Sequence, residues 1–235
     1  IRLGKALGVP VSIKARGADI HYWGARARPR EQIRTAASGA AGLLAVSEAL
    51  KRDMVALGMP EGRIPLHYTG VDHDAFRPLP RREARALVSA LLNLDIPDNA
   101  PLLMVTGALI ERKGQSLVIE ALAKLPDARL ALAGSGPDEA QLRRLATRLC
   151  VSERVQFLGQ VSHELLPQLL SAADVLVLPS ASEGIANAWI EALACGTPVA
   201  VSNTSSLPEV VGDAALLVEP TDVDGMAVAM WRLLS

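Results

Sequence analysis

From about residue 101 to its end, the chain alternates short continuous apolar runs with stretches of helical periodicity. The apolar runs lie at 102–106, 130–133, 155–158, 175–178, 199–201 and 216–218. The helix-like stretches between them include 116–124, 139–149, 164–172 and 188–194. Strands that are apolar throughout are typical of a parallel sheet covered on both faces by helices. The pattern therefore predicts an α/β fold with a doubly wound, Rossmann-like sheet.

The first third of the chain predicts helix, strand, helix, strand. Segments 9–14, 38–46 and 64–68 are apolar, and Ser47 is placed to cap a helix running to Leu57. Two prolines within 77–80 force extended backbone, which we interpret as an interdomain hinge. We therefore expect two domains: residues 1–79, the end of an N-terminal Rossmann-like domain with the hinge, and residues 80–235, a C-terminal Rossmann-like domain.

Composition excludes several classes of protein. A net charge of −1 argues against an extended nucleic-acid surface. Two arginine clusters, at 26–34 and 81–85, are each more often a solvated face than a binding site. Two cysteines indicate no disulfide framework and fit a reducing cytosol. No apolar run approaches the roughly 20 residues that span a bilayer, so we expect a cytoplasmic protein.

The first candidate for chemistry follows the apolar run 102–106. Gly107 ends this run, and Arg112-Lys113-Gly114 is expected to open the next helix. Two cations at a helix N-terminus are electrostatically unfavourable unless an anion is bound there, and phosphate is the obvious anion. A solvated basic turn explains the same residues equally well.

The next run is followed by Gly134-Ser135-Gly136-Pro137, where glycines let the backbone approach a ligand and Pro137 suits the first turn of a helix. A dinucleotide fingerprint would need a further glycine at Glu139, so an NAD site is weakly supported. Taken alone, the segment is a tight turn from strand to helix.

Two glutamates flank the start of the helix after run 175–178. Glu183 lies in the loop, where the ligand of such a fold is expected, and Glu191 lies on the helix among apolar residues. A charge is rarely buried there without a partner. Both carboxylates could accept hydrogen bonds from the hydroxyls of one elongated ligand. The alternative is one N-terminal glutamate favoured by the helix dipole and one satisfied core glutamate. Ser205 and Ser206 begin a further helix entry that could add phosphate contacts or be a plain cap.

Together these residues resemble the retaining glycosyltransferases of GT-B family 4. Glu183 and Glu191, with the Glu-Ala-Leu-Ala-Cys-Gly-Thr-Pro-Val that begins at Glu191, resemble its E-x7-E signature. Gly107-Ala108-Leu109 with Lys113-Gly114 resembles its "GRL…KG" element, and 206–211 resembles its "GG-x-PE-VV" loop. Val-Ser at 46–47 and Gly-Val-Asp at 70–72 resemble its "VS" helix start and "NGVD" hinge. The resemblance covers the chain from about Val9 onward.

The resemblance implies a role for each matching residue. Lys113, Arg112 and Glu183 are the candidate catalytic residues: the two cations would bind the donor diphosphate and Glu183 the sugar hydroxyls. Glu191 would bind the nucleotide ribose. The other candidate donor-binding positions are Gly107, Gly134, Gly136, Val161, Gly184, Ile185, Ala186, Asn187 and Ser205. Catalysis would be mainly electrostatic, with retention of the anomeric configuration and with neither a metal nor another cofactor.

Three departures from the family pattern bear on this carry-over. Ala108 stands where the family often has a phosphate-binding arginine, and Ser205 and Ser206 replace a glycine pair. Arg16 stands where a histidine is usual, in Arg16-Gly17-Ala18-Asp19, with His21 nearby. Arg16, Asp19 and His21 are the acceptor-side candidates, although a structural role is favoured for His21.

The resemblance further implies that most of the acceptor-side domain precedes Ile1. We therefore expect the chain alone to bind donor but to transfer sugar poorly. The expected function is transfer of a hexose from a nucleotide-diphosphate sugar to a glycan or lipid-linked acceptor in polysaccharide biosynthesis, with possible peripheral membrane contact through the N-terminal domain. A nucleotide-sugar epimerase is disfavoured by the glutamate spacing. A non-catalytic nucleotide-sugar-binding module remains the alternative.

Overall fold

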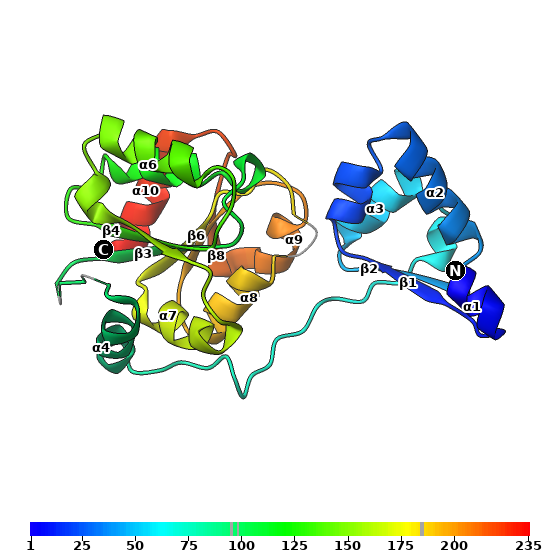
Figure 1. Cartoon of the computed structure of the whole chain (residues 1–235), viewed down its shortest axis with the longest axis horizontal. Helices are drawn as coiled ribbons and strands as arrows, with labels where there is room; N and C mark the ends of the chain where they lie inside the picture. Colours follow the sequence, from blue (N-terminus) through cyan, green and yellow to red (C-terminus); the bar gives the residue numbers. More distant parts are fainter. Residues whose placement is uncertain (95, 98, 184–185) are drawn as a thin grey trace. The chain divides into compact units, whose positions relative to one another are not determined.

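The computed structural model describes residues 1–94, 96–97, 99–183 and 186–235, and it contains two compact units (Figure 1). The first comprises Ile1–Gly70 together with Ser182–Ala186 and Ser205–Val210. The second comprises Val71–Ala181, Asn187–Thr204 and Val211–Ser235. The change from one unit to the other thus falls between Gly70 and Val71, whereas the boundary expected from the sequence follows residue 79.

The second unit contains a six-stranded parallel sheet with the order β5-β4-β3-β6-β7-β8. The strands are β3 (Leu102–Thr106), β4 (Arg129–Ala133), β5 (Val155–Gly159), β6 (Val175–Leu178), β7 (Val199–Ser202) and β8 (Ala215–Val218). All six expected apolar runs are strands, and β3, β4, β6 and β7 are largely buried, as runs without polar alternation require. The strand order reverses between β3 and β6, and ligands of such sheets bind beyond the carboxyl ends of the strands at this point.

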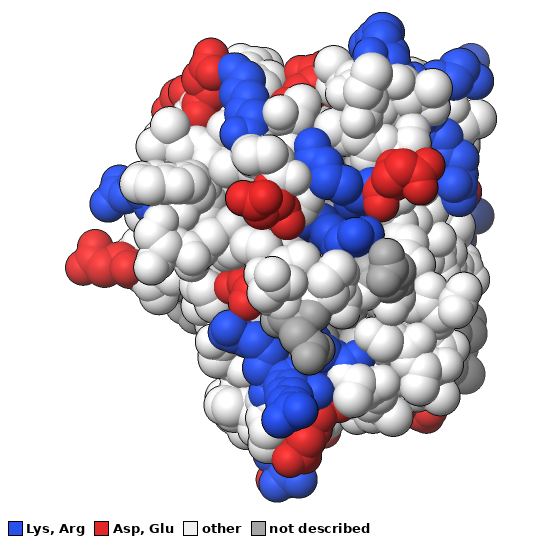
Figure 2. All heavy atoms as spheres, turned by 90° about the vertical axis from the view of Figure 1, so that its left-hand side faces the viewer, with Lys and Arg blue, Asp and Glu red and all other residues white. Residues whose placement is uncertain are grey.

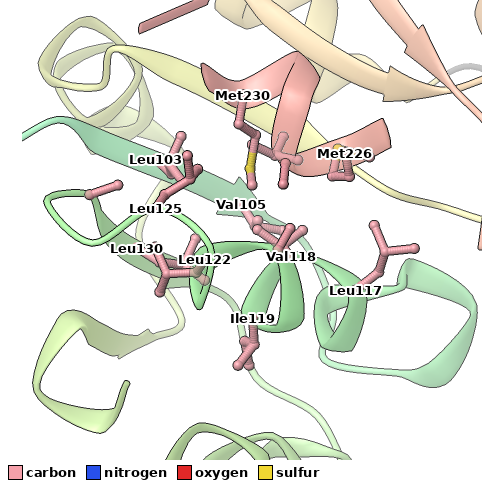
Figure 3. Packing of buried hydrophobic residues seen from close by; sticks show 14 of the residues in the cluster. Leu103, Val105, Leu117, Val118, Ile119, Leu122, Leu125, Leu130, Met226 and Met230 are labelled. Carbon is pink, nitrogen blue, oxygen red and sulfur yellow. The ribbon is translucent and has the colours of Figure 1, made fainter. Parts of the chain in front are cut away.

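Helices cover both faces of this sheet. On one face, α5 (Gln115–Leu122), α6 (Glu139–Arg148) and α10 (Val223–Leu234) enclose a core that includes Leu103, Val105, Val118 and Met230 (Figure 3). The other helices of the unit are α4 (Arg81–Leu92), α7 (Leu166–Ala172) and α8 (Asn187–Ala194), and α7 contacts both α4 and α8. A short helix, α9 (Leu207–Val211), follows β7. The sequence analysis did not predict α4 or α10.

The first unit contains a two-stranded parallel sheet of β1 (Ser12–Ala15) and β2 (Gly42–Ala45) with α1 (Arg2–Leu7), α2 (Ala27–Ser38) and α3 (Glu48–Ala56). Its own core includes Leu43, Leu50 and Met54. The predicted cap of α3 is confirmed, because the Ser47 hydroxyl accepts a hydrogen bond from the Leu50 amide at 3.1 Å. The predicted strand at 64–68 is wrong: only Leu66 bridges to β2, and Pro65 has no amide to donate.

On the face shown in Figure 2, basic and acidic side chains are scattered among uncharged residues and lie next to one another in several places. Members of both arginine clusters make contacts within the fold. Arg81 and Arg85 of α4 pair with Asp174 at 2.8 and 2.5 Å. Arg26 donates to the Tyr22 carbonyl and stacks on the Tyr22 ring, 3.7 Å from its centroid. These contacts give Arg26, Arg81 and Arg85 roles within the fold.

Candidate functional site

The loop after β3 places Lys113 beside Gly107. A single 3-10 turn, Glu111–Lys113, follows the strand, and Gly114 then adopts a left-handed conformation (φ 66°) before α5 begins at Gln115. A Cβ atom built on Gly107 would lie 3.9 Å from the Lys113 Nζ atom. The ammonium group therefore lies near the carboxyl end of β3. As expected, Arg112-Lys113-Gly114 leads into the next helix, since Gly114 is the N-cap residue of α5, but both cations lie in the 3-10 turn before this cap.

The loops after β3 and β4 are joined backbone to backbone. The Gly107 amide donates to the Ala133 carbonyl at 2.9 Å, and the Leu109 amide donates to the Ser135 carbonyl at 3.0 Å. A Cβ atom on Gly134 would collide with the carbonyl of Gly107, and one on Gly136 would collide with that of Leu109. Glycine is thus required at Gly134 and Gly136 by the approach of another loop. Whether a ligand also approaches them stays a prediction.

The loop after β6 completes this group. The Ala181 amide donates to the Arg112 carbonyl at 2.8 Å, and a Cβ atom on Gly114 would collide with the Pro179 carbonyl. Gln115, which is buried, donates from its side-chain amide to the Ala108 carbonyl at 2.9 Å. Sequence reasoning missed Gln115, although a polar residue at the start of an otherwise apolar helix was a usable signal. Loops from β3, β4 and β6 thus converge around the basic turn, at the reversal of strand order.

Glu191 lies on α8 with its side chain only 12% exposed. The sequence demanded a partner for this charge, and the structure provides His163, whose Nε2 atom lies 3.6 Å from Glu191 Oε1. Burial raises the pKa of the Glu191 carboxyl, and the neighbouring His163 opposes that shift. His163 also packs edge-on against Phe76, with ring centroids 5.2 Å apart. No sequence signal linked His163 to Glu191.

Val161 and Asn187 are the other candidates of the second unit. Val161 is two residues before His163, in the loop after β5, so the segment expected to surround the nucleoside also supplies the partner of Glu191. Asn187 is the first residue of α8. Gly184 and Ile185 lie outside the described residues.

Glu183 belongs to the first unit, in the loop before α8, and its side chain is largely buried. Its backbone amide donates to the Ser205 hydroxyl at 3.4 Å. Ser205 has φ 53°, a left-handed conformation that favours glycine. This conformation explains why the family pattern has glycine where this chain has serine. Ala186, which is also buried, closes the same short segment.

The acceptor-side candidates make two separate sets of contacts. The Asp19 carboxylate accepts hydrogen bonds from the amides of Arg16 (3.1 Å) and Gly17 (2.8 Å), so it stabilises its own turn. His21 lies 2.8 Å from Asp53 through Nε2 and 2.9 Å from the Ser182 hydroxyl through Nδ1. Contact with an acceptor stays a prediction for Arg16, Asp19 and His21.

Lys113 and Glu191 belong to the second unit and Glu183 to the first. Their meeting around one ligand stays a prediction. Within the described ranges, no group of three or more His, Cys, Asp and Glu residues is arranged to hold a metal ion. In the same part of the chain, no helix has the length and apolar character needed to cross a membrane.

Comparison with known proteins adds the family. The model of the glycosyl transferases group 1 family matches residues 93–235. The chain belongs to this family. D-inositol 3-phosphate glycosyltransferase of Mycobacterium tuberculosis is 37% identical over 187 residues, which are 77% of this chain and 37% of that protein. The chain therefore spans little more than a third of the length of this relative.

Solved structures of glycosyltransferases share the fold. HepE from Anabaena, in complex with UDP and glucose, matches with a TM-score of 0.86 at 23% identity, covering 99% of this chain and 64% of that one. Sucrose-phosphate synthase from Thermosynechococcus elongatus matches with a TM-score of 0.79 at 28% identity, covering 92% and 55%. The expected α/β, GT-B-type fold is confirmed.

Proposed function

We propose that this chain is the donor-binding part of a retaining glycosyltransferase that transfers a hexose from a nucleotide-diphosphate sugar to a glycan or lipid-linked acceptor. Family membership supports the transferase class. The name of the mycobacterial relative supports glycosyl transfer, and the UDP-glucose complex of HepE supports a nucleotide-sugar donor. The observation that carries the proposal is the position of the Lys113 ammonium beside Gly107, at the reversal of strand order.

The proposed chemistry is electrostatic. When the bond between the anomeric carbon and the diphosphate breaks, negative charge develops on the leaving diphosphate, and Lys113, assisted by Arg112, stabilises it. Glu191 accepts hydrogen bonds from the ribose hydroxyls, and Glu183 accepts them from the sugar. No metal takes part in this proposal.

The second candidate is a non-catalytic nucleotide-sugar-binding module. It is favoured by Ala108 and Arg16, which replace the arginine and histidine of the family pattern. The two candidates share donor binding and differ in turnover, so release of free UDP from UDP-glucose by the full-length protein, followed in the presence of candidate acceptors, separates them. Appearance of an α-linked product would support the retaining transferase.

Donor binding is tested by calorimetric titration with UDP, and with UDP-, GDP- and ADP-sugars, of wild type, Lys113→Ala and Lys124→Ala. Lys124 is the matched control, since its ammonium pairs with Asp224 on the surface. Because the variant Lys113→Ala loses a charge-assisted contact to phosphate, it should bind UDP about 10-fold or more weakly than wild type. Its affinity for UDP should also depend less on salt concentration. If both variants bound UDP with the affinity of wild type, Lys113 would not be a ligand of the diphosphate.

A further inference from the structure

A chain of hydrogen bonds runs from α3 to the loop that carries Glu183. Asp53 of α3 lies 2.8 Å from His21 Nε2, and His21 Nδ1 lies 2.9 Å from the hydroxyl of Ser182, the residue before Glu183. The His21 side chain is 22% exposed, so water competes only partly for its contacts. All three residues belong to the first unit.

The chemistry of the three groups fixes which group donates and which accepts in each of these hydrogen bonds. A carboxylate can only accept, so Asp53 selects the tautomer in which His21 Nε2 carries the proton. Nδ1 of the neutral ring is then an acceptor, and the Ser182 hydroxyl donates to it. Asp53 thereby sets the orientation of the imidazole, and the imidazole sets the position of Ser182.

A second contact ties the same helix to the neighbouring segment. The Glu209 carboxylate accepts hydrogen bonds from the amides of Glu48 (2.8 Å) and Ala49 (3.0 Å), at the amino end of α3. An anion is favoured at this end of a helix by the dipole and by the unpaired amides. Ser205, in the same segment as Glu209, accepts the hydrogen bond of the Glu183 amide. Both segments that hold the Glu183 backbone are thus anchored on α3.

We propose that His21, Asp53 and Ser182 are positioning residues that fix the Glu183 loop for binding of the donor sugar. This inference rests on the proposed function, because it takes Glu183 as the ligand of the sugar hydroxyls. It gives His21 a role other than contact with the acceptor. This hydrogen-bonded relay of Asp53, His21 and Ser182 acts on the hexose end of the donor. It leaves the contacts of the diphosphate and ribose with Lys113 and Glu191 unchanged.

The first measurement needs no ligand. Hydrogen exchange of the peptide containing Glu183 is compared among wild type, Ser182→Ala and His21→Ala. The controls Ser38→Ala and His67→Ala remove the same groups from the first unit, where Ser38 bonds to the Thr35 carbonyl and His67 to Lys14. The relay variants should exchange faster in this peptide, with little change in the Leu43 core, and the controls should match wild type. Unchanged exchange in both relay variants would overturn the proposal.

The second measurement separates the two ends of the donor. Loss of one or two hydrogen bonds of this network should weaken UDP-glucose binding by about 3- to 10-fold in Ser182→Ala and His21→Ala, whereas UDP affinity should change less than about twofold. Asp53→Asn should show the same selectivity. An equal loss for UDP and UDP-glucose would indicate general damage and would overturn the positioning role. A wild-type protein that binds neither ligand would contradict the proposed function itself, whatever the exchange result.

Discussion

The burial of Glu191 opposes stability, and the proposed function gives its carboxylate a ligand to bind. Its carboxylate is nearly buried on α8, and the burial raises its pKa, while the partner His163 is 71% exposed. An ion pair with so exposed a partner is screened by water and repays little of the cost of burial. Such a residue is unfavourable in the absence of a ligand, and the proposed function accounts for it by hydrogen bonds to the ribose of the donor.

Replacement of Glu191 by Gln should therefore stabilise the free protein at neutral pH. Because the folded-state pKa is raised, the protonated carboxyl contributes stability that is fully present below the unfolded pKa near 4.5 and is lost as pH rises through the folded value. Glutamine stays neutral, so Glu191→Gln should gain on the order of 1 kcal/mol at pH 7, roughly 2–4 °C in Tm, and this gain should disappear below about pH 4.5.

Thermal melts across this pH range, with the exposed Glu164→Gln as control, check the stability of Glu191→Gln. The variant should also bind UDP about 10-fold more weakly, because an amide is a poorer acceptor for ribose hydroxyls than a carboxylate. A variant that is less stable than wild type at pH 7 would show that the His163 contact outweighs burial.

Sequence reasoning succeeded at the residue scale where one side chain carries its own signal. Ser47 is predictable as a cap because a hydroxyl before an amphipathic stretch satisfies local amides, and this needs no tertiary information. Glu191 was predictable as a buried charge in need of a partner. Its partner was not predictable, since His163, in the turn before α7, and Glu191, on α8, come together only in the folded chain.

At the scale of elements, the close approach of the loops after β3 and β4 explains why Gly134 and Gly136 must be glycine, without any ligand. Gly134 has φ 150°, and its missing side chain leaves room for the Gly107 carbonyl. The sequence predicted these glycines as points where the backbone approaches a ligand. It could not distinguish a ligand from a neighbouring loop, because both require the same absent Cβ atom.

Gly134→Ala should thus be destabilising even in the absence of nucleotide. The new methyl group would collide with backbone that cannot rotate away, in a conformation that side chains rarely adopt, so we expect a loss of about 3 kcal/mol or more. Gly62→Ala is the control, since a Cβ atom there meets no atom within 4 Å. Chemical denaturation of both variants checks the difference. Similar midpoints would mean that the two loops separate at little cost.

The elements that the sequence pattern predicted best are those whose environment is uniform. β3 and β6 are apolar throughout because both faces of the sheet are covered, and their bounds matched. α4 was obscured by its arginines, which pair with Asp174, a residue distant in sequence. The false strand at 64–68 has the right composition, but β2 accepts only one bridge residue from it.

For the whole molecule, the composition of the two units depends on contacts between segments that are far apart in the sequence. The sequence suggested a division at the prolines of 77–80, because proline restricts the backbone. The structure assigns Ser182–Ala186 and Ser205–Val210 to the first unit, although they follow β6 and β7 of the second. These segments join the first unit through contacts such as that of Glu209 with α3, and no local sequence pattern predicts such contacts.

The separate cores allow the two units to be perturbed independently. Leu43 lies in the core of the first unit and Leu103 in that of the second, and both are almost fully buried. Truncation of either to Ala should cost about 2–5 kcal/mol through lost burial and the cavity left behind. Leu91→Ala, on the exposed face of α4, should cost little. Because Lys113 and Glu191 belong to the second unit, Leu103→Ala should weaken UDP binding, whereas Leu43→Ala should leave it within about twofold of wild type.

Hydrogen exchange locates the destabilised core in each variant, and calorimetry gives the affinity. If Leu43→Ala abolished UDP binding while the second core stayed protected, the assignment of the nucleotide ligands to the second unit would be wrong.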